Sequence, residues 1–193
     1  MPSDCLHMTA LEVTHSQTAD EIEALVAKLL PSAAEIADAT FHHRARLVKP
    51  LVSFDSQALA LSFLPASGET GRSAGEDAYT YHHLRRDLHS QVESAGVKVA
   101  SRYVIPSAHL TIARFIDKRE FEGQNGKVDG SKCTALIKVI DNLNAWLEAE
   151  YWPKEGPIKK GGEWIVGEGK GLDCRKGTLW YGGGETVHLG KGF

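Results

Sequence analysis

The sequence has few cysteines, and their positions fit no framework. Cys5, Cys133 and Cys174 are odd in number and far apart in a chain of 193 residues. A disulfide framework needs cysteines in pairs, and a cysteine metal site needs at least two of them close together in the sequence. The pattern therefore argues against a disulfide-rich secreted protein and against a Cys-x-x-Cys metal site, and it predicts reduced thiols inside the cell.

Long apolar runs and an excess of positive charge are also missing. No apolar stretch reaches the about 18 residues of a membrane span, and the N-terminus lacks the charged and apolar regions of a signal peptide. The net charge is −3, with 22 Lys and Arg against 25 Asp and Glu, which argues against binding of duplex nucleic acid. A cleft for one or two nucleotides remains compatible with this charge. We expect a protein of the cytoplasm, with the nucleus as the alternative, that has no membrane partner.

The size and composition of the chain predict one soluble globular domain. Hydrophobic residues make up 42% of the sequence, which is enough for a sizeable core. A chain of this length forms one domain, or two small lobes that share a core. We therefore treat residues 1–193 as a single domain and expect a monomer.

Two short segments far apart in the chain resemble each other. Leu6-His7-Met8-Thr9-Ala10 and Ala108-His109-Leu110-Thr111-Ile112 each hold His-x-Thr with apolar residues between and around the pair. Side chains alternate between the two faces of an extended strand, so the histidine and the threonine of each segment share a face. The apolar residue between them faces the opposite way, where a core can cover it. The pattern predicts one polar site built from two strands.

The same spacing also has a purely structural interpretation. Two buried histidines, each hydrogen-bonded to a neighbouring threonine, would show it without any chemistry, and the sequence leaves this alternative open. Five further histidines have no cysteine or carboxylate partners at the spacing of metal ligands, so the sequence predicts no metal site. They are His42, His43, His82, His83 and His89. His15 and His188 are expected to be structural.

Apolar periodicity and capping signals predict the order of the elements. Strands are expected from the first motif to about Val13, at 46–54 and 58–64 as a hairpin, at 97–104, from His109 to about Ile116, and as short pieces at 163–166, 178–181 and 186–189. Helices are expected after the capping box formed by Thr18 and Glu21, and at 32–39, 76–95 and 132–151. On the last helix the expected apolar face consists of Leu136, Ile140, Leu143 and Leu147.

At the level of its motifs the chain resembles the two-histidine (2H) phosphoesterases, the LigT-like or RNA ligase/cyclic nucleotide phosphodiesterase superfamily. Both His-x-Thr segments are similar to the paired motifs of that family. Arg114, which completes His-x-Thr-x-x-Arg, resembles the second motif of the LigT-like branch. The wide separation of the motifs and the helix–hairpin–helix pattern between them also fit, and the Gly-rich tail with Trp180 and Tyr181 is similar to fungal members.

The resemblance implies an α+β fold with two lobes. Two antiparallel sheets would surround a central cleft, with helices on the outside. The first motif would lie in a lobe of residues 1–65 with the C-terminal strands, and the second motif in a lobe of residues 76–150. Family members have a strand and a helix before the first motif, and we expect both to be missing here. The motif sheet would then have an uncovered edge, unless the C-terminal strands lie against it.

The resemblance also implies which residues do the chemistry. His7 and His109 would be catalytic, and Thr9 and Thr111 would bind the phosphate. Opening a cyclic phosphodiester needs a base to activate water and an acid to protonate the leaving ribose oxygen, and histidine can do either near neutral pH. Hydroxyl donors stabilise the charge on the phosphoryl oxygens. In the family the first histidine is the acid and the second the base, but the sequence alone leaves the direction open.

Arg114 and Tyr181 complete the predicted substrate-binding residues. By strict alternation Arg114 faces away from His109, so it reaches the site only through a β-bulge or at the end of the strand. An ion pair elsewhere is the alternative. Tyr181, like Tyr103 and Trp180, could stack on a nucleobase or lie in the core.

The sequence therefore predicts a hydrolase that opens a 2′,3′-cyclic phosphate or a related small cyclic phosphodiester without metal or cofactor. Its partner would be a cyclic nucleotide or an RNA end with a 2′,3′-cyclic phosphate, not duplex nucleic acid. A non-catalytic module that binds a nucleotide or an RNA end is one alternative, and a 2′-5′ RNA ligase is another.

Overall fold

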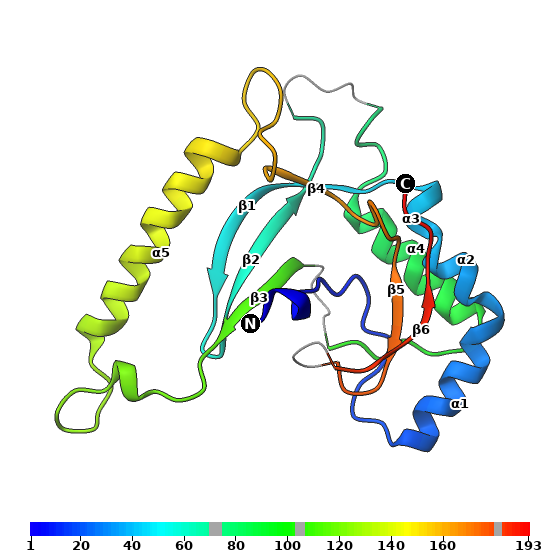
Figure 1. The fold of residues 1–193 in the computed structure, drawn as a ribbon, viewed down its shortest axis with the longest axis horizontal. Helices are drawn as coiled ribbons and strands as arrows, with labels where there is room; N and C mark the ends of the chain where they lie inside the picture. The colour runs from blue at the N-terminus through cyan, green and yellow to red at the C-terminus, as the bar shows by residue number, and fades with distance from the viewer. Residues whose placement is uncertain (70–74, 103–106, 180–182) are drawn as a thin grey trace.

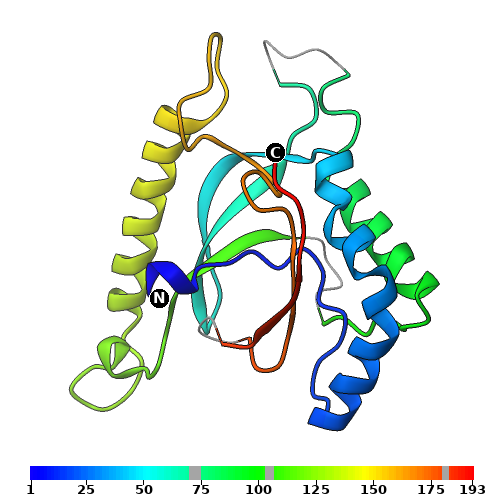
Figure 2. The same ribbon diagram turned by 45° about the vertical axis from the view of Figure 1, so that its right-hand side comes forward.

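The chain forms a mixed α+β structure around a curled antiparallel sheet. Figure 1 shows the computed structural model, which describes residues 1–69, 75–102, 107–179 and 183–193. The sheet has four strands in the order β3-β2-β1-β4, and a separate two-stranded sheet pairs β5 with β6. The larger sheet lies between the long helix α5 (Gly130–Tyr151) on one side and the helices α1 to α4 on the other (Figures 1 and 2). The predicted α+β class is confirmed at this level.

The central hairpin of the sheet is the one that the sequence predicts. β1 (Arg46–Phe54) and β2 (Ala58–Pro65) pair in antiparallel fashion. The carboxylate of Asp55 closes the turn, because it accepts hydrogen bonds from the backbone N–H groups of Gln57 and Ala58 at 2.7 and 2.8 Å. β3 (Ala108–Arg114) extends the sheet beside β2, and β4 (Glu163–Ile165) pairs with β1 on the other side.

The helices before the hairpin begin at a side-chain cap. Thr18 and Glu21 form the predicted capping box, from which α1 (Ala19–Leu29) begins. The predicted helix at 32–39 is split into a 3-10 turn and two short helices. These are η2 (Leu30–Ser32), α2 (Ala33–Ala37) and α3 (Ala39–His42). None of the described helices combines the length and the apolar character needed to cross a membrane.

The core forms where α4 (Tyr81–Ser94) packs on one face of the sheet. Thr80 precedes the helix, and its N–H donates to Nδ1 of His83 at 3.1 Å, so the helix begins at Tyr81 and not at the predicted Glu76. The buried side chains of this core come from both layers: Leu47, Phe63 and Ala108 from the sheet, and Tyr81, Leu84 and Leu88 from α4. This packing leaves the opposite face of β2 and β3 outside the core.

Helix α5 lies along the edge of β1 and makes hydrogen bonds to it. The side-chain amide of Asn144 accepts from the N–H of Val52 at 2.7 Å and donates to the carbonyl of Val52 at 3.0 Å. Trp152 donates its indole N–H to the carbonyl of Pro50 at 2.9 Å. Of the predicted apolar face, Ile140 is buried, whereas Leu143 is 44% exposed, so the structure covers this face only in part. Asn144 faces the strand because its amide can match the hydrogen-bonding groups of the backbone.

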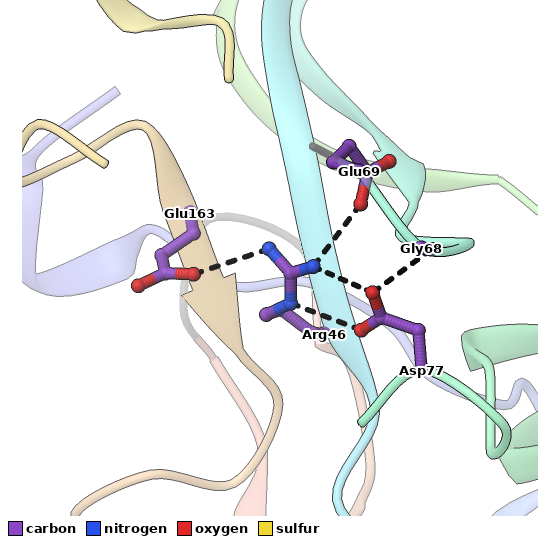
Figure 3. Close-up of polar contacts among 5 residues, drawn as sticks. All are labelled: Arg46, Gly68, Glu69, Asp77 and Glu163. Carbon is purple, nitrogen blue, oxygen red and sulfur yellow. Dashed lines mark hydrogen bonds and ion pairs between the residues drawn. The ribbon is translucent and has the colours of Figure 1, made fainter. Parts of the chain in front are cut away.

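One buried arginine joins three parts of the chain (Figure 3). Arg46 of β1 donates from Nε and Nη2 to the two oxygens of Asp77, at 3.0 and 2.6 Å. It also forms ion pairs with Glu69 at 3.0 Å and with Glu163 of β4 at 3.3 Å. The side chains of Arg46 and Asp77 are only 7% and 2% exposed. The guanidinium therefore ties the chain that follows β2 to both β1 and β4.

Two predicted strands are wrong in the described chain. Residues before Val13 form the 3-10 helix η1 (Ser3–Cys5) and a single bridge at Met8, without a regular strand. Residues 97–102 also form no regular strand, although the N–H of Ala100 donates to the carbonyl of Val13 at 2.8 Å. Residues 103 and 104 lie outside the described residues. Backbone groups of both segments bond to scattered partners instead of one neighbouring strand.

The C-terminal region contributes to both sheets. The short strands expected at 163–166 and 186–189 correspond to β4 and to β6 (Glu185–Leu189). The partner of β6 is β5 (Asp173–Lys176) and not the expected piece at 178–181, of which only 178 and 179 are described, without a strand. None of these described strands pairs with β3, so the free edge of β3 is approached by the N-terminal segment instead.

Replacing Arg46 with methionine should strongly destabilise the fold. The substitution keeps an apolar stem but leaves the carboxylates of Asp77, Glu69 and Glu163 together without the guanidinium. Removing one partner from a buried ion pair costs about 3–5 kcal/mol, so urea denaturation should show a loss of that size in the free energy of unfolding. Arg86→Met is the matched control, since Arg86 is 65% exposed in its pair with Asp87 and should cost about 1 kcal/mol or less. Equal losses for the two variants would contradict a structural role for Arg46.

Candidate functional site

The second motif occupies β3, and its register against β2 sets which side chains share a face. His109 lies directly opposite Ser62, and Thr111 lies opposite Ala60. Leu110, between them, lies opposite Leu61, and both pack against the hydrophobic core. Neighbouring side chains in a strand point to opposite faces, and Leu110 points to the core. His109 and Thr111 therefore lie on the face away from the core.

A β-bulge in β3 brings Arg114 to the same face. Ala113 pairs with Leu59 and Thr111 pairs with Ala60, so Ile112 is an extra residue in β3. A bulge of one residue shifts the alternation of side chains beyond it. Arg114 then lies opposite Ala58, on the same side as Ala60 and Thr111. The carbonyl of Ile112 accepts a hydrogen bond from the N-terminal ammonium of Met1 at 2.8 Å.

The first motif lies beside β3 through a single antiparallel bridge. Met8 pairs with Leu110, so each motif contributes the residue between its histidine and threonine. An antiparallel bridge at these residues brings His7 level with Thr111, and Thr9 level with His109. Figure 2 shows the N-terminal segment, in dark blue, passing beside the green strand β3.

The bridge also determines the direction of the side chains in the first motif. Met8, like Leu110, packs against the core cluster. Because neighbouring side chains in extended chain alternate, His7 and Thr9 point to the other side, which is the side of His109 and Thr111. Four of the predicted site residues thus share one face. His7 is exposed, and the other three are half-buried. The alternative of two buried structural histidines does not describe His7.

Each catalytic candidate has its Nδ1 atom held by a group two residues earlier in the chain. Nδ1 of His7 lies 3.0 Å from the carbonyl oxygen of Cys5. A carbonyl can only accept, so this nitrogen carries a proton and the ring of His7 has a fixed orientation. Nδ1 of His109 lies 3.0 Å from the hydroxyl of Ser107, which can donate or accept.

The surroundings of His109 lower its pKa below the ordinary histidine value. Burial is the main cause, because it disfavours the charged imidazolium. The positive charges of His7 and Arg85 act in the same direction, and the carboxylate of Asp55 opposes them. A lowered pKa favours the neutral imidazole of His109, and a neutral imidazole suits a base. The influence of His7 also indicates that the two imidazoles are near enough to interact electrostatically.

Helix α4 supports the backbone of the first motif with two side chains that the sequence analysis missed. Tyr81 donates from its hydroxyl to the carbonyl of Thr9 at 3.5 Å, and Arg85 donates from Nη1 to the carbonyl of Ala10 at 2.5 Å. Tyr81 and Arg85 are one helical turn apart. Burial raises the pKa of the Tyr81 hydroxyl, and the hydrogen bond and positive charge of Arg85 oppose that rise. The sequence signal for this pair is its spacing of four residues, which places Tyr81 and Arg85 on the same side of a helix.

The carboxylate of Asp55, in the β1–β2 turn, interacts electrostatically with Arg114 and His109 of β3. Hydrogen bonds from the N–H groups of Gln57 and Ala58 lower the pKa of the Asp55 carboxyl, and the charges of Arg114 and His109 add to that effect. Arg114 therefore lies close enough to Asp55 to interact with it, at the end of the strand where it pairs with Ala58. Asp55 was not among the predicted site residues.

The aromatic residues that were predicted as candidates for stacking on a nucleobase are not described by the structure. Tyr181, and with it Tyr103 and Trp180, lies outside the residues that the structure describes. Within the described ranges no group of three or more His, Cys, Asp and Glu residues is arranged to hold a metal ion. The face thus combines two imidazoles, two threonine hydroxyls and the guanidinium of Arg114. Such a set can transfer protons to and from an anionic substrate and stabilise negative charge on it.

Replacing Arg85 with glutamine should raise the pKa of His109 toward the ordinary histidine value. The substitution removes a positive charge that disfavours imidazolium at His109, while a polar side chain of similar length remains. Titration of the imidazole proton signals by NMR measures this directly and needs no enzymatic activity. Arg86→Gln, at the next and more exposed position of α4, should leave the titration of His109 unchanged. An unchanged pKa in the Arg85→Gln variant would show that the arginine only supports the backbone.

Comparisons with known proteins found no relative of this chain. The chain matches no protein-family model, no curated protein and no solved structure. The interpretation of the site therefore depends on the bridge between the two motifs, the bulge in β3 and the electrostatic surroundings of His109.

Proposed function

We propose that the chain is a metal-independent cyclic phosphodiesterase of the 2H type, which opens a 2′,3′-cyclic phosphate or a related small cyclic phosphodiester. The bridge between Met8 and Leu110 is the observation that carries the proposal. It brings together two His-x-Thr segments that are about 100 residues apart in sequence, with both apolar residues packed against the core and all four polar ones on the other face. A buried structural pair would not need two matched copies of the same polar residues.

In the proposed reaction His109 is the base and His7 the acid. The neutral imidazole of His109 takes a proton from water as the water oxygen forms a bond to phosphorus. The bond from phosphorus to one ribose oxygen breaks, and that oxygen takes a proton from the imidazolium of His7. The lowered pKa of His109 supports its role as base. The carbonyl of Cys5 supports the acid role, because it holds Nδ1–H of His7 and leaves Nε2–H to be donated.

The remaining groups of the face would bind the phosphate. Thr9 and Thr111 each provide a hydroxyl two residues from a histidine, which can donate to a phosphoryl oxygen as negative charge increases. Arg114 would add a positive charge from the end of β3, where the bulge turns it to this face. The two histidines supply both proton transfers, so the reaction needs no cofactor. Tyr181 remains a proposed stacking residue.

The same proposal extends to the fold and to the setting of the protein. The bilobal arrangement of the family, with two sheets around a central cleft, is the fold that we propose in detail. β3 carries the second motif, and it shares one sheet with β1 and β2 from the lobe that we propose for the first motif. We propose a monomer in the cytoplasm or nucleus that acts on a cyclic nucleotide or on an RNA end.

A direct assay tests the reaction. Wild-type protein should open 2′,3′-cyclic AMP in the presence of EDTA, and His7→Ala or His109→Ala should lower kcat about 10²–10⁴-fold, because each removes one proton-transfer group. His89→Ala is the matched control, since His89 is exposed on α4 and pairs only weakly with Glu93 at 3.8 Å. Liquid chromatography of the nucleotide products gives the rates.

Three outcomes would replace the proposal. No hydrolysis, with nucleotide binding seen by calorimetry, would favour the non-catalytic module. Joined products from RNA ends at high RNA concentration would favour the 2′-5′ ligase. Equal rates for wild type and both histidine variants would remove these histidines from the reaction altogether.

The pH dependence should reveal the base. His109 acts as a base only when neutral, so kcat/KM should fall as the pH drops through its pKa. Because burial and the neighbouring positive charges lower that pKa, the midpoint of the fall should lie below the ordinary value of 6.5. The Arg85→Gln variant should move the midpoint upward, by the same amount that NMR finds for the imidazole. A midpoint above 6.5 in the wild type would assign the titration to another group.

A further inference from the structure

The strands beside the second motif present small side chains to the proposed site. Ala58, Ala60 and Ser62 of β2 lie opposite Arg114, Thr111 and His109, so all six share one face. All six are half-buried, which shows that this face is partly open to solvent. The other face of β2 carries Leu59, Leu61 and Phe63. Alanine is a poor strand former, so its use at two positions on the open face needs a reason other than strand stability.

Two serine hydroxyls form a pair on this face. Ser62 lies directly opposite His109, and across the sheet Ser53 of β1 lies opposite Ala60. The hydroxyl oxygens of Ser53 and Ser62 are 2.6 Å apart, and either can be the donor. One hydroxyl proton is used within the pair, so the pair still offers one donor and several lone pairs. Both serines are half-buried.

The serine pair lies across the sheet from the first motif, with β3 between them. Neighbouring strands are about 4.8 Å apart, so β2 and β1 lie about 5 and 10 Å from β3. On the other side of β3 lies the first motif, joined at Met8. A molecule whose phosphate is held by both motifs has β2 and β1 beside it on the same face of the sheet. That span corresponds to the size of a nucleoside.

We propose that the Ser53–Ser62 pair is the subsite for the nucleoside that carries the cyclic phosphate. The inference depends on the proposed function, since it takes the phosphate to lie between His7 and His109. Ser62 and Ser53 then form a hydrogen bond to a polar group of the nucleoside, a ribose hydroxyl or a base edge, which can donate and accept as the pair can. Ala58 and Ala60 leave the room that the sugar needs. The pair selects nucleotides over smaller cyclic phosphodiesters.

Two substrates separate this role from a role at the phosphate. Ser62→Ala should lower kcat/KM for 2′,3′-cyclic AMP about tenfold, the loss of one hydrogen bond of typical strength. The same variant should change kcat/KM for glycerol 1,2-cyclic phosphate, which has no nucleoside, less than twofold. Ser53→Ala should behave alike, and the double variant should lose no more than either single one, because the two hydroxyls act as a unit. Ser90→Ala, at an exposed position of α4 where the hydroxyl donates to the carbonyl of Arg86, is the matched control.

Each result decides the matter. An unchanged kcat/KM for the nucleotide, or an equal loss on both substrates, would overturn the nucleoside subsite. If the wild type opens neither substrate, the proposed reaction fails, and the subsite is then tested by calorimetric binding of 2′-AMP and 3′-AMP against inorganic phosphate. Weaker binding of the nucleotides to Ser62→Ala, with binding of phosphate unchanged, would support the subsite. Equal binding of the nucleotides to both proteins would exclude it.

Discussion

The antiparallel pairing of Met8 with Leu110 is the contact on which the arrangement of the site depends. It joins the start of the chain to the edge of the central sheet, and it works through both backbone and side chains. The backbone bridge sets which residues are level with each other, and burial of the methionine and leucine side chains sets which face is polar. Since no regular strand surrounds Met8, hydrogen bonds from Tyr81 and Arg85 to neighbouring carbonyls supply the support that a longer ladder would give.

The register of the sheet extends this arrangement across β2 and β1. The extra residue Ile112 allows Arg114 to lie on the face of Thr111, which a regular strand would forbid. The bulge thus changes the face of Arg114 and leaves His109 and Thr111, which precede it, on their own face. The same face carries the hydroxyls of Ser62 and Ser53, so the polar surface continues from the first motif to the third strand of the sheet.

Local signals in the sequence predicted most of the regular elements. The hairpin of β1 and β2, the capping box of α1 and the long helix α5 depend on residues near each other in the chain, so their patterns are visible without the fold. The extended pattern around His7 predicted a strand and was wrong, because α4 side chains take the carbonyls that a strand would have used. The sequence named the bulge as the way for Arg114 to reach the site, but the position of the extra residue depends on pairing with β2. Arg85, Asp55 and Ser62 were missed because they lie near His109 only in the folded chain.

The amide of Asn144 has a consequence for the behaviour of the protein in concentrated solution. By bonding to both backbone groups of Val52, it occupies hydrogen-bonding positions that a strand from a second molecule would use to add to β1. Such a strand would first have to displace the long helix to which Asn144 belongs. At this position of β1 the hydrogen-bonding groups of the strand are therefore satisfied within the chain, by a polar side chain on the helix face that meets the strand.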